Sequence, residues 1–378
     1  MRISYDRAVT RRRFLSACGA ASLLAPANAA QTYKPKNLIL LTSDGLRWQD
    51  LFTSIDPHLM NEKYAGMTKA GAAELREHLW KPQPEERRLA LMPYFWGRLG
   101  PAGVVLGNVS KGSSVKVTNR YGSSYPGYSE ILTGRAQDDV IHGNDPVQNP
   151  TPSFLQFVRQ QWNLPKAKVA VFGSWDMFHY IAESRRGEIF VNAGYEACGV
   201  PAGNPIVDEL NKLQIEARYG DSARHDAFTF GLAVEYMKSV QPRVLHIAFD
   251  ETDDWAHAHQ YEEVLNSIRF VDDTLRELWT WVESSPAYRD STTLMVTCDH
   301  GRGSTLYDWH SHGQNVSGSD QIWIAAVGPD TPATGEVINS ATYYQRDIAP
   351  TALELLGLGG GGYPGILGKP IGALLGRS

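Results

Sequence analysis

The sequence TTLMVTCDHG at residues 292–301 joins an apolar, β-branched run to a carboxylate, an imidazole and a glycine. Such a run is typical of a buried strand, and the glycine allows the chain to turn where the strand ends. In open α/β sheets, ligand sites lie at the carboxyl ends of the strands. Asp299 and His300 are therefore placed where both can bind one divalent metal ion. Taken alone, the dipeptide fits a simple strand end with an Asp turn equally well.

The rest of the chain alternates strand-like and helix-like segments. Strands are expected at residues 37–42, 103–109, 168–172, 244–249 and 322–327, and amphipathic helices at residues 224–239, 261–283 and 346–356. This alternation predicts an α/β fold in which helices cover both faces of a mainly parallel sheet. The chain has 378 residues, of which 42% are hydrophobic and 20% charged, so it can form a large core.

The first thirty residues have the pattern of a twin-arginine export signal. A run of three arginines at residues 11–13 precedes a weakly apolar stretch, and residues 27–29 (Ala-Asn-Ala) match a cleavage site. A basic amphipathic helix is the alternative. We expect residues 1–30 to be a signal peptide with the Tat export machinery as partner, and the protein to be periplasmic or secreted.

Residues 31–378 are expected to form a single domain. Two segments, near residues 50–100 and 175–222, are rich in Gly, Pro and aromatic residues. They have no clear periodicity and are interpreted as irregular insertions that could cover a site.

Charge and cysteine content narrow the classes of partner. Residues 1–30 carry five basic side chains and one acidic one, so their removal changes the net charge from −5 to −9. Such a chain is not expected to bind nucleic acid or an anionic membrane. No later segment has the roughly 18 consecutive apolar residues of a membrane span, so no stable membrane anchor is expected. The pattern leaves open whether Cys198 and Cys298 pair, and it leaves the oligomeric state open.

Two further groups of acidic and imidazole side chains follow other expected strands. Asp44 lies directly after the first one, in a Ser-Asp-Gly turn. Asp253 and His257 lie just beyond residues 244–249, and a spacing of four places both on one face of a helical turn. Each pattern alone is also typical of a turn or a solvated acidic loop.

A third group is formed by His312 in a His-Ser-His-Gly sequence. Oxygen and imidazole ligands together favour Zn²⁺ or Mn²⁺ over Ca²⁺ or a structural zinc ion. The predicted ligands are too many for one tetrahedral ion and suit two: Asp44, Asp253, His257, Asp299, His300 and His312. His310 and Asp250 are alternative ligands if the register differs.

A nucleophile for such a centre lies in the segment RYGSSYPGYSE at residues 120–130. Pro126 suits the first turn of a helix, which places Ser124 near the helix N-terminus. The N–H groups and positive dipole end found there favour an alkoxide and a bound phosphate. A metal ion lowers the pKa of a serine hydroxyl, so no Ser-His-Asp triad is needed. Without the metal ligands, Ser124 would be interpreted as a helix cap.

The order of these motifs resembles the alkaline phosphatase superfamily of metalloenzymes. The match runs through Asp44-Gly45, Ser124-x-Pro126, Asp253-x-x-x-His257, Asp299-His300-Gly301 and Ser311-His312-Gly313, and it covers nearly all of residues 31–378. The chain looks most like the branch of nucleotide pyrophosphatase/phosphodiesterases, with sulfatase and phosphopentomutase relatives. The resemblance implies a three-layer, alkaline-phosphatase-like sandwich.

The resemblance also implies a mechanism. One metal ion would be held by Asp44, Asp299, His300 and the Ser124 oxygen, and the other by Asp253, His257 and His312. Ser124 would attack a small phosphoric ester, and water would release the phosphoseryl intermediate. The cofactors would be two divalent metal ions, Zn²⁺ first and Mn²⁺ second. Asn119 and Arg302 are candidates for contacts to the substrate.

Differences between this sequence and the motifs of the superfamily help to distinguish the possible activities. Sulfatases have an Arg four residues after the nucleophile, whereas this chain has Tyr128, which argues against sulfate-ester chemistry. Phosphatase and phosphodiesterase activity both remain, and the aromatic residues near 50–100 would suit the second substituent of a diester. The alternatives are a sulfatase, phosphonate hydrolase or phosphomutase on the same scaffold, or a relative that binds metal without catalysis.

Overall fold

Three adjacent parallel strands form the centre of the fold. These strands, β1 (Asn37–Ser43), β6 (Val244–Phe249) and β7 (Thr292–Thr297), are buried along their whole length. β1 lies between the other two and is parallel to both. A strand with no exposed face needs cover on both sides of the sheet, which parallel crossover connections supply as helices. The predicted limits of these strands agree with the structure to within one residue.

A computed structural model describes residues 36–360 and 362–377. The predicted signal peptide, residues 1–30, lies outside the described residues. The described residues belong to one compact unit. Its large sheet has the order β10-β2-β9-β7-β1-β6-β4-β5, and a small sheet has the order β11-β3-β8. The remaining strands are β2 (Val104–Leu106), β3 (Ser114–Lys116), β4 (Val169–Gly173), β5 (Phe190–Ala193), β8 (Gln321–Ile322), β9 (Ile324–Val327), β10 (Gly335–Glu336) and β11 (Thr342–Tyr344).

One predicted strand is divided between the two sheets. The segment 322–327 was expected to be continuous, but β8 ends at Ile322 and β9 begins at Ile324. Trp323 lies between them, is fully buried, and donates from its indole nitrogen to the Leu46 carbonyl (2.9 Å). β9 runs antiparallel to both β7 and β2. Among the described strands of the large sheet, β9 alone runs against the rest, so the sheet is mainly parallel as predicted.

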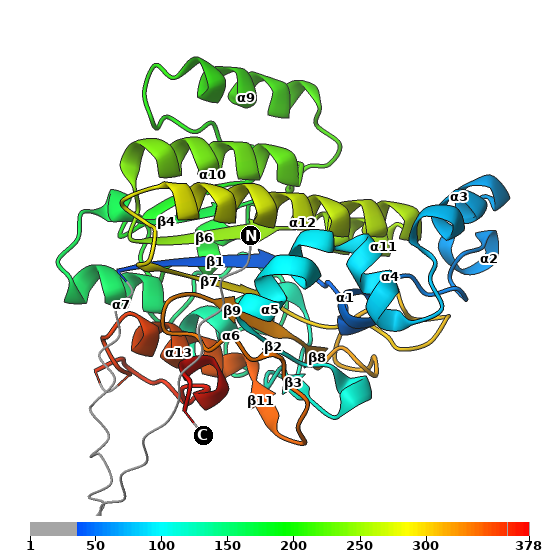
Figure 1. Cartoon of the computed structure of the whole chain (residues 1–378). Helices are drawn as coiled ribbons and strands as arrows, with labels where there is room; N and C mark the ends of the chain where they lie inside the picture. The colour runs from blue at the N-terminus through cyan, green and yellow to red at the C-terminus, as the bar shows by residue number, and fades with distance from the viewer. Residues whose placement is uncertain (1–35, 361, 378) are drawn as a thin grey trace, which may run out of the picture. The chain divides into compact units, whose positions relative to one another are not determined.

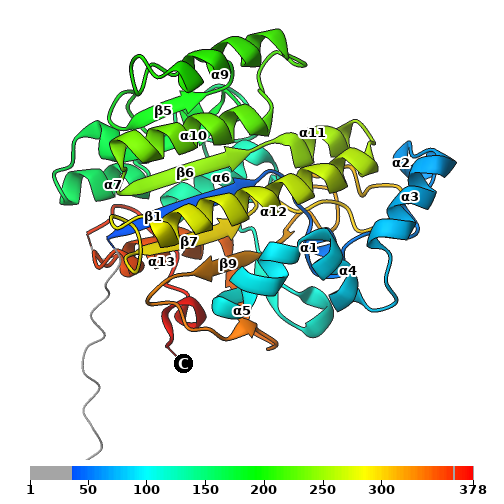
Figure 2. The same cartoon turned by 45° about the horizontal axis from the view of Figure 1, so that its top comes forward.

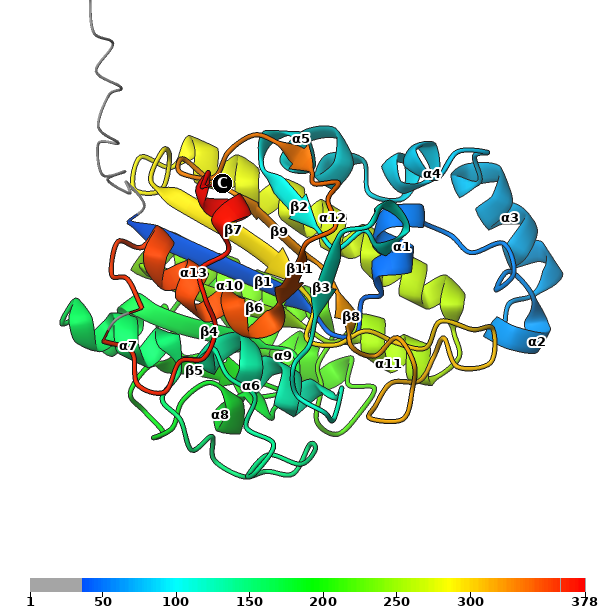
Figure 3. The same cartoon turned by 90° about the horizontal axis from the view of Figure 1, so that it is seen from below.

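Helices cover both faces of the large sheet, which confirms the predicted three-layer α/β architecture (Figure 1). One face carries α10 (Asp226–Val240) and α12 (Tyr261–Ser284), and α9 (Pro205–Glu216) packs outside α10 (Figure 2). The other face carries α6 (Ser124–Thr133), α7 (Phe154–Gln161) and α13 (Ile348–Leu355) (Figure 3). In α12 the buried side chains recur every three or four residues, which explains why the sequence predicted this helix so closely.

The segments near 50–100 and 175–222 are more regular than expected. They contain α1 (Trp48–Thr53), α2 (Glu62–Ala65), α3 (Lys69–Leu79), α4 (Pro84–Leu91), the π-helix η1 (Phe95–Leu99), α5 (Gly100–Ala102), α8 (Phe178–Ile181), β5 and α9. The prediction of irregular structure was wrong, because most of these helices are too short to show a clear helical period. Asn61 and Thr68 cap two of them, and such closely spaced caps obscure the helical period.

The aromatic residues of the first segment belong to the core. Phe95 is buried, and Trp48, Trp80, Tyr94 and Trp96 pack against the hydrophobic core. Trp96 also donates from its indole nitrogen to the Leu51 carbonyl (3.1 Å). These aromatic side chains therefore stabilise the packing of α1 to α5 against the core.

The other described helices are short: α11 (Glu251–His257), η2 (Val109–Lys111), η3 (Lys166–Lys168), η4 (Gln345–Asp347) and η5 (Gly372–Leu375). No helix in the described part of the chain is long and apolar enough to cross a membrane. Cys198 and Cys298 are both buried and free, so the structure shows no disulfide between them.

Candidate metal centre and nucleophile

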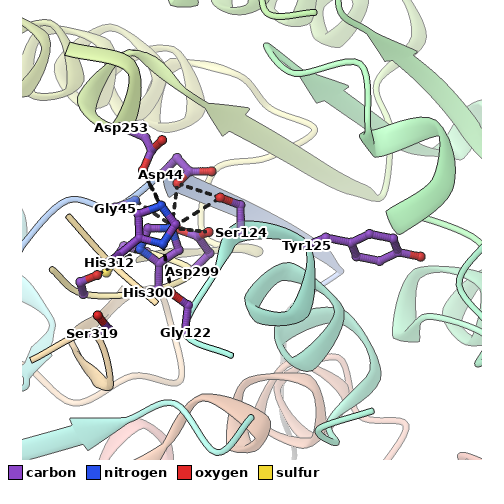
Figure 4. A network of polar contacts seen from close by, with 12 residues as sticks. Asp44, Gly45, Gly122, Ser124, Tyr125, Asp253, Asp299, His300, His312 and Ser319 are labelled. Carbon is purple, nitrogen blue, oxygen red and sulfur yellow. Dashed lines mark hydrogen bonds and ion pairs between the residues drawn. The ribbon is translucent and has the colours of Figure 1, made fainter. Parts of the chain in front are cut away.

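The predicted ligands lie at the carboxyl ends of the three central strands. Asp44 directly follows β1, and Asp299 is the second residue after β7. The helix α11, which carries Asp253 and His257, begins two residues after β6. The strand register places Ser43 opposite Phe249, and Thr42 opposite Thr297, so these three ends meet at one edge. Figure 4 shows the side chains from these ends converging on one point.

Asp44, Asp299 and His300 form the buried part of the cluster. His300 Nε2 lies 3.2 Å from Asp44 Oδ1 and 3.4 Å from Asp299 Oδ2. His300 Nδ1 donates to the Gly301 carbonyl (2.9 Å), so Nε2 is the nitrogen directed at the carboxylates. Such a backbone bond fixes the tautomer and orientation of a metal-binding imidazole.

Asp253, His257 and His312 form the more open part. His257 Nε2 lies 3.2 Å from Asp253 Oδ2 and 3.0 Å from His312 Nε2. His312 Nδ1 donates to the Gly122 carbonyl (2.9 Å), which directs its Nε2 into the cluster. Asp253 also lies 3.7 Å from His300 Nε2, so it stands between the two parts.

Two groups of ligand atoms have the spacing that a metal ion requires. The atoms of Asp253, His257 and His312 lie within 4.8 Å of one another, as do those of Asp44, Asp253 and His300. The second group differs from the predicted one because it contains Asp253 in place of Asp299. The cluster therefore brings all six predicted ligands together, with Asp253 shared between the two parts.

The electrostatics of the cluster fit bound cations. Burial raises the pKa of Asp299 well above its usual range, and the nearby Asp44 carboxylate raises it further. The Oδ2 atoms of both residues are buried and make no hydrogen bond. Burial lowers the pKa of His300, but the Asp299 and Asp44 carboxylates outweigh burial and raise it to about 9. In the metal-free protein a proton on His300 thus supplies charge that these carboxylates need.

His312 has the opposite tendency. Burial lowers the pKa of His312 strongly, and the charges of His300 and Arg302 lower it further. The ring is therefore neutral at neutral pH, with its Nε2 lone pair facing His257. A neutral imidazole is the form that binds a metal ion.

Ser124 is the first residue of α6 and reaches the same cluster. Its hydroxyl donates to Asp44 Oδ1 (3.4 Å) and lies 3.3 Å from His300 Nε2. Pro126 lies in the first helical turn, as predicted. A Cβ atom added at Gly127 would overlap the Asp299 carbonyl oxygen, so glycine permits the close approach of α6 to the end of β7. This contact places the hydroxyl among the predicted ligands.

The two predicted substrate contacts are occupied by protein partners. Asn119 donates from Nδ2 to the Glu130 carboxylate (2.9 Å), and its Oδ1 accepts from the Tyr121 and Gly122 N–H groups (3.2 and 3.0 Å). Arg302 is buried and bonds Gly45, Asp253 and His310. Burial lowers the pKa of Arg302 to about 9, so its guanidinium remains charged at neutral pH.

The alternative ligands lie beside the cluster. The His310 ring stacks on His259, with 3.7 Å between the ring centroids. Burial raises the pKa of Asp250 well above its usual range, and the carboxylates of Asp254 and Asp44 raise it further. Neither residue has the spacing of the two ligand groups described above.

Sequence reasoning missed two residues that shape the site. Asn144 Oδ1 accepts a hydrogen bond from the Tyr125 N–H (3.0 Å). Because Tyr125 directly follows Ser124, this bond holds the Asn144 carboxamide beside the start of α6. Asp226 is buried and accepts from the N–H groups of Asp250 and Glu251 (2.8 and 3.2 Å), so it caps α11, which carries Asp253 and His257. No sequence motif marks Asn144, which lies in a turn-rich stretch. Asp226 is the first residue of α10, and its position in the sequence does not reveal that its side chain caps α11.

A family model for type I phosphodiesterases and nucleotide pyrophosphatases matches residues 77–315, which is more than half of the chain. The chain belongs to this family. The matched range contains the nucleophile segment and all predicted ligands except Asp44. No curated protein sequence matches the chain.

Solved structures show the same fold at low sequence identity. Alkaline phosphatase PafA has a TM-score of 0.60 at 12% identity, covering 92% of this chain and all of that one. A phosphonate monoester hydrolase from Silicibacter pomeroyi has a TM-score of 0.56 at 15% identity (91% and 77% covered). A 2-O glycosaminoglycan sulfatase, BT1596, has 0.56 at 12% (91% and 75%). The family and the fold make this chain a hydrolase of the alkaline phosphatase superfamily, as the sequence motifs indicated.

Proposed function

We propose that this protein is a two-metal hydrolase of phosphoric esters that uses Ser124 as a covalent nucleophile. The observation that supports it best is the Ser124 hydroxyl at the start of a helix, 3.4 Å from the Asp44 carboxylate and 3.3 Å from His300. Both side chains belong to a cluster in which the buried Oδ2 atoms of Asp44 and Asp299 make no hydrogen bond. A cation bound there would compensate the buried negative charge.

The chain offers ligands for two divalent ions. Asp44, Asp299 and His300 would hold one beside Ser124, and His257 and His312 the other, with Asp253 between them. Mixed oxygen and imidazole ligands favour Zn²⁺ first and Mn²⁺ second. Bound metal ions would lower the pKa of the serine hydroxyl and of water and would stabilise the charge on phosphoryl oxygens.

Ser124 then acts as follows. Its Oγ attacks phosphorus, the new P–O bond forms as the bond to the ester oxygen breaks, and the alcohol leaves with a proton. Water hydrolyses the phosphoseryl ester and restores the hydroxyl. The positive end of the α6 dipole lies at Ser124 and would stabilise the anionic phosphoryl group. The Tyr125 N–H does not contribute directly, because it already donates to Asn144 Oδ1.

Asn144 is proposed to donate to a non-bridging oxygen of the substrate. Its Oδ1 is bonded to the Tyr125 N–H, and its amide NH₂ makes no hydrogen bond within the described residues. Asn144→Ala is expected to lower kcat/KM by about 10²- to 10³-fold, the usual effect of losing one such donor. Asp145→Ala, a change at the next exposed residue of the same loop, is the control and should leave kcat/KM within a factor of about three. Equal rates for Asn144→Ala and wild type would remove Asn144 from the mechanism.

Phosphodiesters are the proposed substrates, in keeping with the family. The extra negative charge of a monoester needs a cation in the pocket, and Arg302, the predicted candidate, is held by protein groups instead. Sulfate esters are not favoured, because Tyr128 is buried where sulfatases have an arginine.

Three chromogenic esters test the proposed function. The purified protein without residues 1–30 is assayed with bis-p-nitrophenyl phosphate, p-nitrophenyl phosphate and p-nitrophenyl sulfate, before and after removal of metal by a chelator. We expect the highest kcat/KM for the diester, little turnover of the sulfate, and recovery of activity when Zn²⁺ or Mn²⁺ is returned. Full activity in the metal-free protein, or faster turnover of the sulfate, would contradict the proposal.

Export by the twin-arginine route is proposed for the same protein. The basic run, the weakly apolar stretch and the Ala-Asn-Ala sequence at residues 27–29 support it. N-terminal sequencing of the exported protein tests it, since cleavage after Ala29 leaves Ala30 as the first residue.

A further inference from the structure

Arg302 joins the segments that carry the predicted metal ligands. Its side chain is only 1% exposed, and it makes four hydrogen bonds. Nε donates to the Gly45 carbonyl (3.2 Å), Nη1 to the His310 carbonyl (2.5 Å), and Nη2 to both the carbonyl (3.3 Å) and the carboxylate of Asp253. A buried guanidinium bonded in this way fixes the position of every group that it contacts.

Each contact lies next to a predicted ligand. Gly45 follows Asp44, and His310 lies two residues before His312. Asp253 is a predicted ligand itself, and Arg302 lies two residues after His300. One side chain therefore connects the ends of β1 and β7, the helix α11 and the loop that carries His312.

The contact with Asp253 is distinctive. Among the described residues, Arg302 is the one Arg or Lys whose side chain pairs with a predicted ligand carboxylate. Asp44, Asp253 and Asp299 would repel one another in the metal-free protein, and a fixed positive charge beside Asp253 opposes that repulsion.

We propose that Arg302 is a positioning residue that holds Asp253 and the His310–His312 loop in the arrangement that binds metal. The proposal rests on the proposed function, because it assumes that these residues bind metal ions. It assigns Arg302 a role different from substrate contact. The proposal also predicts the direction in which metal affinity changes when Arg302 is replaced. A positioning role predicts weaker metal binding. If Arg302 only competed with metal for the Asp253 carboxylate, its removal would strengthen metal binding.

The test compares Arg302→Gln and Arg302→Lys with wild type. Zn²⁺ content is measured by elemental analysis, the Zn²⁺ dissociation constants by competition with a chelator, and KM and kcat with the best ester. For Arg302→Gln we expect one of two zinc sites to weaken about 10- to 100-fold, the usual effect of losing such a supporting partner. kcat should recover in excess Zn²⁺, with KM little changed. Arg302→Lys keeps the charge but not the planar fork, so intermediate binding is expected.

Arg47→Gln is the matched control. The Arg47 guanidinium is also buried, and it bonds the Asp50 carboxylate (2.7 and 2.8 Å) but none of the six predicted ligands. Its loss should leave both zinc sites unchanged. The thermal midpoint of each metal-free variant shows whether it is folded, and Arg302→Lys carries the test if Arg302→Gln does not fold.

Each remaining outcome identifies a different error. Unchanged or tighter zinc binding in both Arg302 variants overturns the positioning role, and a raised KM with normal zinc binding assigns Arg302 to the substrate instead. Wild-type protein that binds no zinc or manganese contradicts the proposed metal centre itself, and the role of Arg302 with it.

Discussion

Ser124→Ala is expected to lower kcat/KM for phosphoric esters by about 10⁴-fold or more, the scale on which enzymes lose activity without their covalent nucleophile. Without this hydroxyl, no phosphoseryl intermediate can form at the start of α6, and hydrolysis would require direct attack by water. Zn²⁺ content should stay close to the wild-type value, because the six Asp and His ligands remain and only the Ser124 oxygen is lost. The measurement is steady-state kinetics on the best ester, together with elemental analysis.

Ser123→Ala is the matched control for this variant. Ser123 precedes the helix and makes no capping hydrogen bond with its side chain. Its replacement removes the same hydroxyl group one residue away, so kcat/KM should stay within about threefold of wild type. Ser124→Thr, which keeps a hydroxyl, should retain measurable turnover. If Ser124→Ala kept full activity, the nucleophile assignment would be wrong even if the protein is an esterase.

Asp299→Asn is expected to remove one of two metal equivalents and to lower kcat/KM by about 10³-fold. The amide oxygen can still accept from the Gly45 N–H, as Asp299 Oδ1 does at 3.0 Å, so the change removes charge more than shape. Burial and Asp44 raise the pKa of Asp299, so the charged carboxylate is costly without metal. The metal-free variant should therefore be at least as stable as metal-free wild type.

Thermal unfolding with and without Zn²⁺ measures this difference. Wild type should gain about 2.7 kcal/mol per site when Zn²⁺ is present at 100 times its dissociation constant, and Asp299→Asn should gain about half as much in total. Asp273→Asn, an exposed carboxylate paired with Arg276, changes the net charge equally and should behave as wild type. Two tightly bound equivalents in Asp299→Asn would show that this carboxylate is not a ligand.

The convergence of the acidic ligands could be predicted from the sequence, because Asp44, Asp253 and Asp299 each lie within a few residues of the end of a buried strand. Buried parallel strands read as continuous apolar runs, so the ends of β1, β6 and β7 were visible as the points where polar residues begin. Their meeting at one edge follows from parallel pairing alone. The motif order then sufficed to name the superfamily.

Contacts between distant segments could not be predicted in the same way. The reversed strand β9 has the same apolar character as a parallel strand, and only its pairing with β7 and β2 reveals its direction. Asn144 and Arg302 have no spacing pattern. Most of their partners are backbone groups, and two of these, Tyr125 and Gly45, lie on other segments of the chain. Backbone partners leave no signal in residue types, so the roles of both side chains required coordinates.

The close contact of α6 with the end of β7 limits how this catalyst can be redesigned. Any side chain at Gly127 would push the helix away from the Asp299 carbonyl, and the serine would move with it. The distance between the Ser124 oxygen and the predicted ligands is thus set by direct backbone contact between Gly127 and Asp299, and no side chain can be replaced to change it. New specificities on this scaffold are therefore more accessible through the loop around Asn144, or the one after His312, than through shifts of the helix.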